Sequence, residues 1–289
     1  IRAGGPAIGF QTVSAQMYVD QGITLGQVNT DEAVSLSATQ PTVAVVAPLD
    51  ISPQMLMWDP AVHPNWHTIA DVGRSNTRVL YYQTATFMQY LIGAGILHQS
   101  QVDGSYDGSP ANFVASGGSI AQQGFATNEP YLYAKALPQW DKPVAFQLIN
   151  DTGYPMYSEP LTVRASQEKA LSPCLSKLVP IIQKSEVDYL KSPQATNNLI
   201  VTLAAKYSLG QTYTASEAQF STEQQLKLHI ASNQPGTKTL GGFDPARIQR
   251  IISILTPILS RQGKQTKAGL TPPDIATSEF VDPNIGLSS

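Results

Sequence analysis

The chain of 289 residues is long enough for one large or two small domains with buried cores. Charged residues make up only 13% of it, and the net charge of -3 offers no basic surface for DNA or RNA. No apolar run approaches the roughly 18 residues of a membrane span, and a single cysteine, Cys174, excludes a disulfide within the chain. A surface left mainly to Gln, Asn, Ser and Thr favours an exported protein over a nucleic-acid binder.

The first half of the chain alternates between strand and helix patterns. Thr30 and Asp31 predict a helix start. The β-branched run 43–47, bounded by prolines, predicts a strand buried on both faces of a parallel sheet. A further strand is predicted over 79–82, and helices over 84–94 and 109–117. This alternation predicts an α/β fold.

The second half is mainly helical. Helices are predicted to begin where an N-cap residue precedes proline, at 172–173, 192–193 and 244–245. The last of these carries an apolar stripe from Ile248 to Leu259 and should end at Gly263. Pro257 should bend or interrupt it.

Two segments, 50–58 and 144–149, predict extended strands, and 154–163 continues the second beyond a turn. If both are antiparallel strands that cross between two lobes, lobe two consists of residues 58–145. Lobe one then consists of 1–57 and 146–289. Two crossings form a hinge over a cleft that can close around a ligand.

The segment 122–133 reads QQGFATNEPYLY, and shorter pieces lie at 4–6 (GGP), 22–26 (GITLG), 30–33 (TDEA) and 66–73 (WHTIADVG). Together they resemble the solute-binding proteins that serve ABC importers of thiamine pyrimidine precursors, aliphatic sulfonates, taurine and nitrate, and N-E-P-Y is the specific piece. The resemblance implies a type 2 periplasmic-binding-protein architecture with two α/β lobes, two hinge crossings and a helical C-terminal section. It also implies a first strand and helix ahead of the glycine-proline piece. Because the chain begins at Ile1, we expect that this βα unit and any upstream signal are missing from it.

The resemblance also implies where a ligand binds, at loop ends and helix starts of both lobes. The candidates in lobe one are Gly5, Pro6, Thr30, Asp31, Glu32 and Asp50. Those in lobe two are Gln83, Thr84, Thr86, Asn128, Glu129 and Tyr131, with Tyr154 at the second crossing. Free N–H groups at the helix starts after Thr30 and Gln83 could hold an anion, although plain N-capping explains the same residues.

Glu129 is the strongest candidate. A carboxylate on a proline-stiffened loop can accept hydrogen bonds from an amine, and Asn128 offers both a donor and an acceptor. The alternative is that this pair only bonds nearby backbone. Seven aromatic residues could sandwich a flat ligand, although core packing is the alternative for each: Trp58, Trp66, Tyr81, Tyr82, Phe113, Tyr131 and Tyr154.

The charges of the candidate residues favour one class of ligand. Arg2 is the only basic side chain in the first sixty residues, whereas Asp31, Glu32 and Asp50 lie at predicted loop ends. Since carboxylates repel an anion at short range, these residues and Glu129 favour an amino-bearing heteroaromatic such as a pyrimidine.

No metal, cofactor or enzymatic activity is predicted. His63 and His67 have the spacing of helical zinc ligands, but Pro64 disfavours a helix there and no third ligand is evident. A single cysteine cannot form the iron-binding motif of the pyrimidine synthase that shares this fold. The chain also contains no G-x-S-x-G, P-loop or G-x-G-x-x-G motif.

The sequence therefore predicts an extracytoplasmic receptor that captures a small molecule in an interlobe cleft and delivers it to the membrane permease of an ABC importer. We expect a monomer, periplasmic or extracellular, that a lipid could anchor to the membrane. Two alternatives stay open. One is the same receptor role for a sulfonate, taurine or nitrate anion. The other is the effector-binding domain of a transcription regulator, which would be a dimer.

Overall fold

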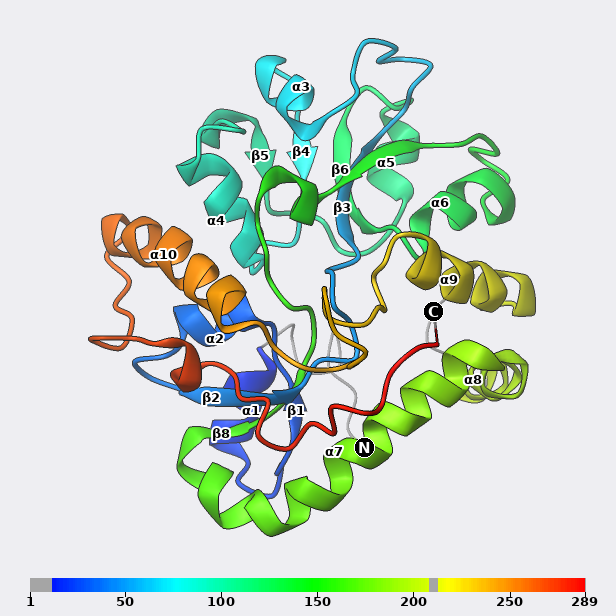
Figure 1. Cartoon of the computed structure of the whole chain (residues 1–289). Helices are drawn as coiled ribbons and strands as arrows, with labels where there is room; N and C mark the ends of the chain where they lie inside the picture. Colours follow the sequence, from blue (N-terminus) through cyan, green and yellow to red (C-terminus); the bar gives the residue numbers. More distant parts are fainter. Residues whose placement is uncertain (1–11, 208–212, 289) are drawn as a thin grey trace. The chain divides into compact units, whose positions relative to one another are not determined.

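The computed structural model describes residues 12–207 and 213–288, which form two compact units (Figure 1). Unit 1 contains the chain up to Ile51, Pro155–Asp188 and the chain from Ala231 onward. Unit 2 contains Ser52–Tyr154 and Tyr189–Ile230. The chain therefore passes between the units four times, and we number these passages one to four in chain order.

The units differ in their bounds from the predicted lobes, 58–145 and 1–57 with 146–289. The strands over 54–58 and 145–148 belong to unit 2 because both are hydrogen-bonded within its sheet. The helical segment 189–230, which the sequence assigns to lobe one, also belongs to unit 2. One contact that holds it there joins the rings of Phe220 and Tyr131, 5.5 Å apart. Passages one and two correspond to the two predicted crossings, and the other two follow from this reassignment.

Unit 1 is built on a three-stranded sheet in the order β1-β8-β2. Both β1 (Gly26–Gln27) and β2 (Thr42–Val46) pair antiparallel with β8 (Leu161–Arg164). The burial of β2 confirms the prediction from its β-branched run, but the predicted parallel sheet is wrong, because the strand beside it is antiparallel. On its other edge β2 makes one isolated parallel bridge, from Ala44 to Ala276.

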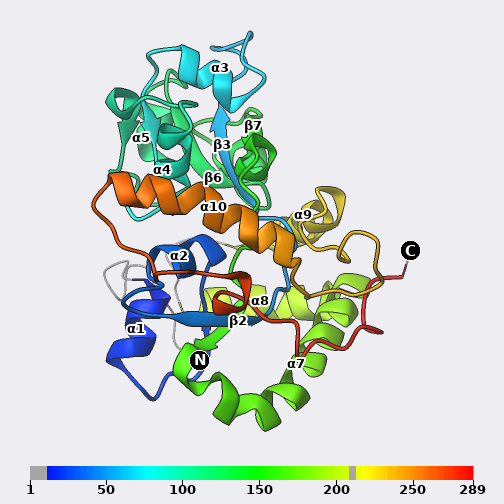
Figure 2. The same ribbon diagram turned by 60° about the vertical axis from the view of Figure 1, so that its left-hand side comes forward.

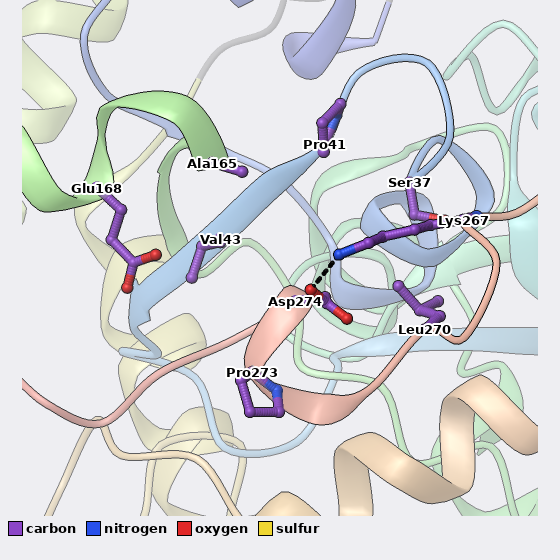
Figure 3. A pocket seen from close by; sticks show the side chains of 9 residues that line it. All are labelled: Ser37, Pro41, Val43, Ala165, Glu168, Lys267, Leu270, Pro273 and Asp274. Carbon is purple, nitrogen blue, oxygen red and sulfur yellow. Dashed lines mark hydrogen bonds and ion pairs between the residues drawn. The ribbon is translucent and has the colours of Figure 1, made fainter.

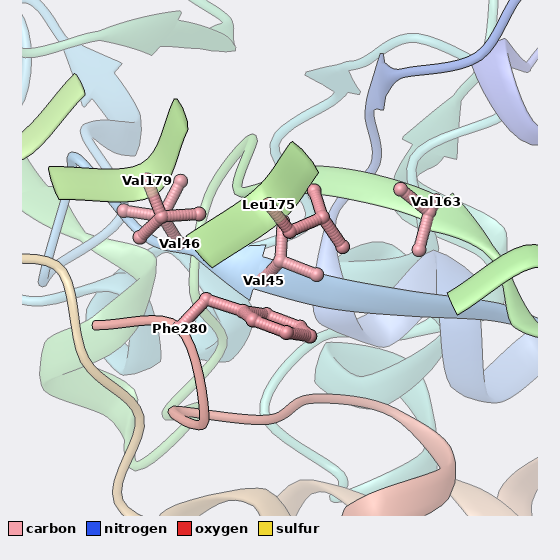
Figure 4. Packing of buried hydrophobic residues seen from close by; sticks show 6 residues of the cluster. All are labelled: Val45, Val46, Val163, Leu175, Val179 and Phe280. Atoms are coloured by element: carbon pink, nitrogen blue, oxygen red, sulfur yellow. The ribbon is translucent and has the colours of Figure 1, made fainter. Parts of the chain in front are cut away.

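The helices of unit 1 cover this sheet. They are α1 (Val13–Val19), α2 (Thr30–Ser35), α7 (Glu168–Lys191, whose last three residues belong to unit 2) and α10 (Pro245–Arg261), with 3₁₀ turns at Ala165–Gln167 and Pro272–Asp274. Figure 4 shows valines of β2 and β8 packed against Leu175 and Val179 of α7 and against Phe280.

Helix α10 confirms the predicted start, because Asp244 caps it and Pro245 is its first residue. Its apolar stripe is buried, and it packs on α2, as both views show (Figures 1 and 2). Pro257 does not interrupt it. The predicted start of α7 at Ser172 is wrong. The helix begins at Glu168 and includes Pro173, and the burial of Leu175 and Val179 offsets the backbone bond that proline removes.

Unit 2 is built on a five-stranded mixed sheet in the order β5-β4-β6-β3-β7. The strands are β3 (Gln54–Trp58), β4 (Val79–Leu80), β5 (Val102–Asp103), β6 (Ala121–Phe125) and β7 (Ala145–Leu148). β4 is parallel to β5 and β6, whereas β3 is antiparallel to β6 and β7. The strands predicted within 50–58, 79–82 and 144–149 are confirmed.

The helices of unit 2 are mostly short. They are α3 (Ile69–Arg74), α4 (Thr86–Gly93), α5 (Ala111–Ala115), α6 (Glu129–Tyr131, followed by a π turn at Leu132–Ala136), α8 (Gln194–Tyr207) and α9 (Ala215–Lys227). 3₁₀ turns lie at Gln99–Gln101 and Ile149–Thr152. Among the residues that the structure describes, no helix has the length and apolar character needed to cross a membrane.

One buried amide ties the C-terminal segment to unit 1. The side chain of Gln183, on α7, is fully buried. Its Nε2 donates to the carbonyl oxygens of Leu240 (2.8 Å) and Asp282 (3.1 Å), and its Oε1 accepts from the Asp282 amide (2.9 Å). Three backbone groups therefore depend on one side chain for their hydrogen bonds.

We expect Gln183→Leu to lower the free energy of unfolding of unit 1 by about 3 kcal/mol or more, because three backbone groups lose their partner and each costs about 1–3 kcal/mol when it is buried. Urea unfolding followed by far-UV circular dichroism measures this loss. All three tryptophans (58, 66 and 140) lie in unit 2, so their fluorescence reports on that unit. Lys184→Ala, at the exposed neighbouring position, is the control. Equal unfolding midpoints for Gln183→Leu and the control would contradict the expectation.

Candidate functional site

The candidate residues of unit 2 lie at one edge of its sheet. Because β4 and β6 are adjacent and parallel, the loops that follow them lie next to each other. The antiparallel pairings bring the start of β3 and the end of β7 to this same edge. We call it the carboxyl edge of unit 2, and passages one and two leave from it. In open α/β sheets, ligands bind outside the carboxyl ends of parallel strands.

Glu129 lies at this edge, four residues after the end of β6. A turn in which the Asn128 amide donates to the Phe125 carbonyl (2.9 Å) leads into α6. The Glu129 side chain is only 7% exposed, and its Oε2 accepts from the Phe125 amide at 2.7 Å. Gly124 leaves room for it, since a Cβ there would lie 3.0 Å from the Glu129 Cδ. The glycine and the glutamate of the family-like segment are therefore packed against each other.

The electrostatic state of Glu129 is unusual for a glutamate. Burial raises its pKa to about 7, against the opposing effect of hydrogen bonds from the Phe125 amide and the Asn128 side chain. None of the ion pairs found among the described residues includes Glu129. Near neutral pH its carboxyl group is therefore balanced between the neutral and the ionised form, and a ligand can shift that balance.

The charge of this carboxyl group acts on three tyrosines, Tyr82, Tyr106 and Tyr133. The rings of Tyr82 and Tyr106 are 4.8 Å apart. Burial raises the pKa of both hydroxyls, and the charge of Glu129 raises them further. The Tyr82 amide donates to Oε1 of Gln123 on β6 (2.9 Å), which fixes the loop after β4 against β6. Tyr106, three residues after the end of β5, was not among the predicted residues, because the sequence does not show that β5 lies two places from β6.

Gln83, Thr84 and Thr86 reach the same edge of unit 2. Gln83 and Thr84 are exposed in the loop after β4. Helix α4 begins at Thr86, two residues later than predicted, and no side chain caps it. Thr84 is therefore not the cap of this helix. The structure places these residues beside the loop that carries Glu129, as the parallel strands require.

Tyr131 and Tyr154 are occupied by contacts with the protein. Tyr131 is half-buried against Phe220. Tyr154 is 0% exposed, and its ring stacks on Tyr90 at 4.6 Å. The observed role of both is packing, and ligand contact by either stays a prediction.

The candidates at the start of α2 in unit 1 bond to backbone. Thr30 is fully buried, and its Oγ1 accepts from the Tyr157 amide at 3.0 Å. Asn29 is the N-cap residue, and its side chain accepts from the Glu159 amide at 2.7 Å. Oδ1 of Asp31 accepts from the Glu32 amide (2.8 Å). None of these bonds is a side-chain cap of α2, whose N-cap residue is Asn29 rather than the predicted Thr30. Ligand contact at this helix start stays a prediction. The predicted residues Gly5 and Pro6 lie outside the described residues.

Glu32 is a second carboxyl group with a raised pKa. Ser14, which is fully buried, donates its hydroxyl to Glu32 Oε1 at 2.6 Å. Burial raises the pKa of Glu32 to about 7, and the neighbouring Asp31 contributes to the increase. The hydrogen bond to Ser14 joins α1 to α2, which gives this side chain a structural role within unit 1.

Asp50 is not a free carboxylate, and this corrects the prediction from charge. Its Oδ1 forms an ion pair with Nη1 of Arg247 at 2.9 Å, and its Oδ2 accepts from the Ser232 hydroxyl at 3.3 Å. The count of charges in the first sixty residues missed Arg247, which lies far along the chain. The acidic excess that argued against an anionic ligand is therefore smaller than predicted.

Unit 1 also contains a cavity of about 220 Å³, which none of the predicted site residues lines (Figure 3). Val43, Leu270 and two prolines form apolar walls. Lys267 and Asp274 form an ion pair across it, so their charges already satisfy each other.

The two histidines with zinc-ligand spacing do not lie on a helix. The ring of His63 stacks on Trp66, with centroids 3.6 Å apart. In the described part of the chain, no three His, Cys, Asp or Glu side chains are grouped so that they could hold a metal ion.

Comparisons with known proteins give matches only among solved structures. No family model matches the sequence, and no curated protein matches it. The alkanesulfonate-binding protein SsuA from Xanthomonas axonopodis pv. citri, bound to MOPS, is similar with a TM-score of 0.59 and 15% identity, over 95% of this chain and 86% of that one.

Two further structures give comparable values. The periplasmic aliphatic sulphonate-binding protein SsuA from Escherichia coli has a TM-score of 0.58 and 14% identity, over 87% of this chain and 75% of that one. The zinc-bound ligand-binding component of an ABC-type import system from Staphylococcus aureus has a TM-score of 0.57 and 11% identity, over 96% and 84%. The chain therefore has the two-lobed α/β fold of periplasmic binding proteins, as the sequence resemblance implied.

Proposed function

We propose that this protein is a solute-binding receptor, which captures a small molecule outside the cytoplasm and presents it to the permease of an ABC importer. The shared fold supports this role, and so does the gathering of candidate residues at the carboxyl edge of unit 2. The observation that carries the proposal is Glu129, a buried carboxyl group at that edge without an ion-pair partner among the described residues. The receptor acts as a monomer, with or without a lipid anchor.

We propose an amino-bearing heteroaromatic, such as an aminopyrimidine, as the ligand. An amino group donates hydrogen bonds to an ionised Glu129, and a positive charge on the ligand favours that ionised form. The half-buried ring of Tyr82 beside it offers an apolar face to a flat ligand, and the exposed Gln83 and Thr84 offer polar groups.

A sulfonate is the second candidate, and three observations favour it. Two of the structurally similar proteins bind sulfonates, as their names state. Asp50, which had counted against an anion, is neutralised by Arg247. The uncapped start of α4 beside the carboxyl edge also presents backbone N–H groups.

A calorimetric titration of the full chain tests the proposal with a fixed panel: 4-aminopyrimidines, other flat amines, alkanesulfonates, taurine, MOPS and nitrate. We expect an aminopyrimidine to bind and Glu129→Gln to weaken it by about 10- to 100-fold. A hydrogen bond to a charged group contributes about 1.5–3 kcal/mol.

Glu223→Gln, at an exposed position of α9 in the same unit, is the matched control and should bind like the wild type. Binding of a sulfonate alone would overturn the ligand class and keep the receptor. A dimer in gel filtration that binds none of the panel would favour the effector-binding domain of a regulator instead.

The ionisation of Glu129 should also appear in the pH dependence of stability. The folded state keeps the proton up to about pH 7, whereas the unfolded state releases it near pH 4.5. The free energy of unfolding of unit 2 should therefore fall as pH rises from about 4.5 to 7, by about 3 kcal/mol from this group. Below pH 4.5 both states are protonated and the effect vanishes.

Urea unfolding followed by tryptophan fluorescence measures this, because the three tryptophans and Glu129 lie in unit 2, whereas Glu32 lies in unit 1. Glu129→Gln should flatten the curve over this pH window. Glu217, whose pKa burial also raises, is present in both proteins. Its charge also raises the pKa of Glu129, so the difference between the curves reports Glu129 together with this interaction. Parallel curves for the two proteins would show that Glu129 is ionised throughout.

A further inference from the structure

Arg247 bonds to the chain at two of the passages between the units. It is the third residue of α10, and its guanidinium is largely buried. Nη1 forms the ion pair with Asp50, and Nη2 donates to the Asp50 carbonyl. Nε donates to the Pro155 carbonyl (2.9 Å), and Nη2 donates also to the Met156 carbonyl (3.0 Å). Asp50 is the next-to-last residue of unit 1 before passage one, and Pro155 is the first after passage two.

The same group also reaches passage four through Asp50. The Asp50 carboxylate accepts from the hydroxyl of Ser232, the second residue after that passage. One cation therefore connects the unit 1 side of three of the four passages. These segments lie about 50, 155 and 232 residues along the chain, so no local bond could hold them together.

The position of Arg247 is fixed from its other side. The guanidinium lies over the ring of Tyr157, 3.8 Å from its centroid, and the Tyr157 hydroxyl accepts from the Asp244 amide at 2.9 Å. Asp244 caps the helix that carries Arg247. Because the apolar stripe of α10 is buried and the helix packs on α2, this anchor belongs to the packed core of unit 1.

Unit 2 holds the opposite side of passage one. The Ala126 amide donates to the Pro53 carbonyl at 2.9 Å. Asp50 on one side and Pro53 on the other are thus fixed to their own units, and only Ile51 and Ser52 lie between them.

We propose that Arg247 is a positioning residue that anchors the passages to unit 1 and so confines bending to the few residues beyond Asp50 and before Pro155. A planar guanidinium with five donors suits this role, because it can bond a carboxylate and several carbonyls at once. Lysine, a point charge on a flexible stem, cannot. Arg247 contacts no ligand in this role.

Hydrogen–deuterium exchange of the full chain without ligand tests the proposal, whether or not the proposed receptor function holds. In Arg247→Lys we expect exchange in peptides covering 48–54 and 156–159 to become at least tenfold faster, with α4 and α8 unchanged. Arg164→Lys is the matched control. Arg164 is also a buried arginine of unit 1, and it donates to the carbonyls of Met17, Gln21 and Ile23, away from the passages.

Asp50→Asn is a second, milder variant that keeps a hydrogen-bond acceptor for Arg247, and we expect a smaller increase in the same peptides. Unchanged exchange at both passages would overturn the proposal. It would also be overturned if exchange rose equally at the passages in the Arg164→Lys control, or rose throughout unit 1 in both Arg247→Lys and Asp50→Asn. Either result would show general loosening of the unit.

Discussion

The ion pair between Arg247 and Asp50 is the constraint on which the organisation of this chain depends. The chain passes four times between the two units, so segments that are far apart in the sequence must be held next to each other. The residues that hold them are themselves remote in sequence. Removing one partner of a buried ion pair costs about 3–5 kcal/mol, mainly because the other charge is left without a partner. Here Arg247 also donates hydrogen bonds to the carbonyls at passages one and two. The same pair therefore stabilises unit 1 and fixes the position of these passages.

In unit 2, by contrast, a carboxyl group is buried without an ion-pair partner among the described residues. Glu129 has no cation beside it among the described residues, and backbone and amide donors only partly offset its burial. Such a group destabilises the fold when it is ionised. Carboxyl groups with perturbed pKa values gather at functional sites. The position of Glu129 at the carboxyl edge of a sheet, rather than its pKa alone, makes it a ligand residue in this proposal.

Local patterns predicted local structure well, and failed where distant segments meet. Helix α10 followed from a cap, a proline and a buried stripe, all within seventeen residues. The burial of β2 was also predictable, but the direction of its neighbour was not, because β8 arrives more than a hundred residues later. The loop with Glu129 was found through its motif, whereas Tyr106 and Arg247 were missed. The role of Tyr106 depends on the strand order, and that of Arg247 on an ion pair across 197 residues. Neither can be recognised from a single sequence.

The corrected charges change what can be inferred about the ligand. With Asp50 paired, three of the four carboxyl groups that counted against an anion remain: Asp31, Glu32 and Glu129. A pKa of about 7 lets the carboxyl group of Glu129 serve either ligand class. When ionised it accepts from an amine, and when protonated it donates to the oxygen of an anion. Near neutral pH the two forms differ little in free energy, so charge repulsion no longer excludes a sulfonate. An amine should release the proton from Glu129 on binding, and a sulfonate should take one up. The two ligands are therefore distinguished by whether binding releases or takes up a proton, rather than by the number of acidic residues.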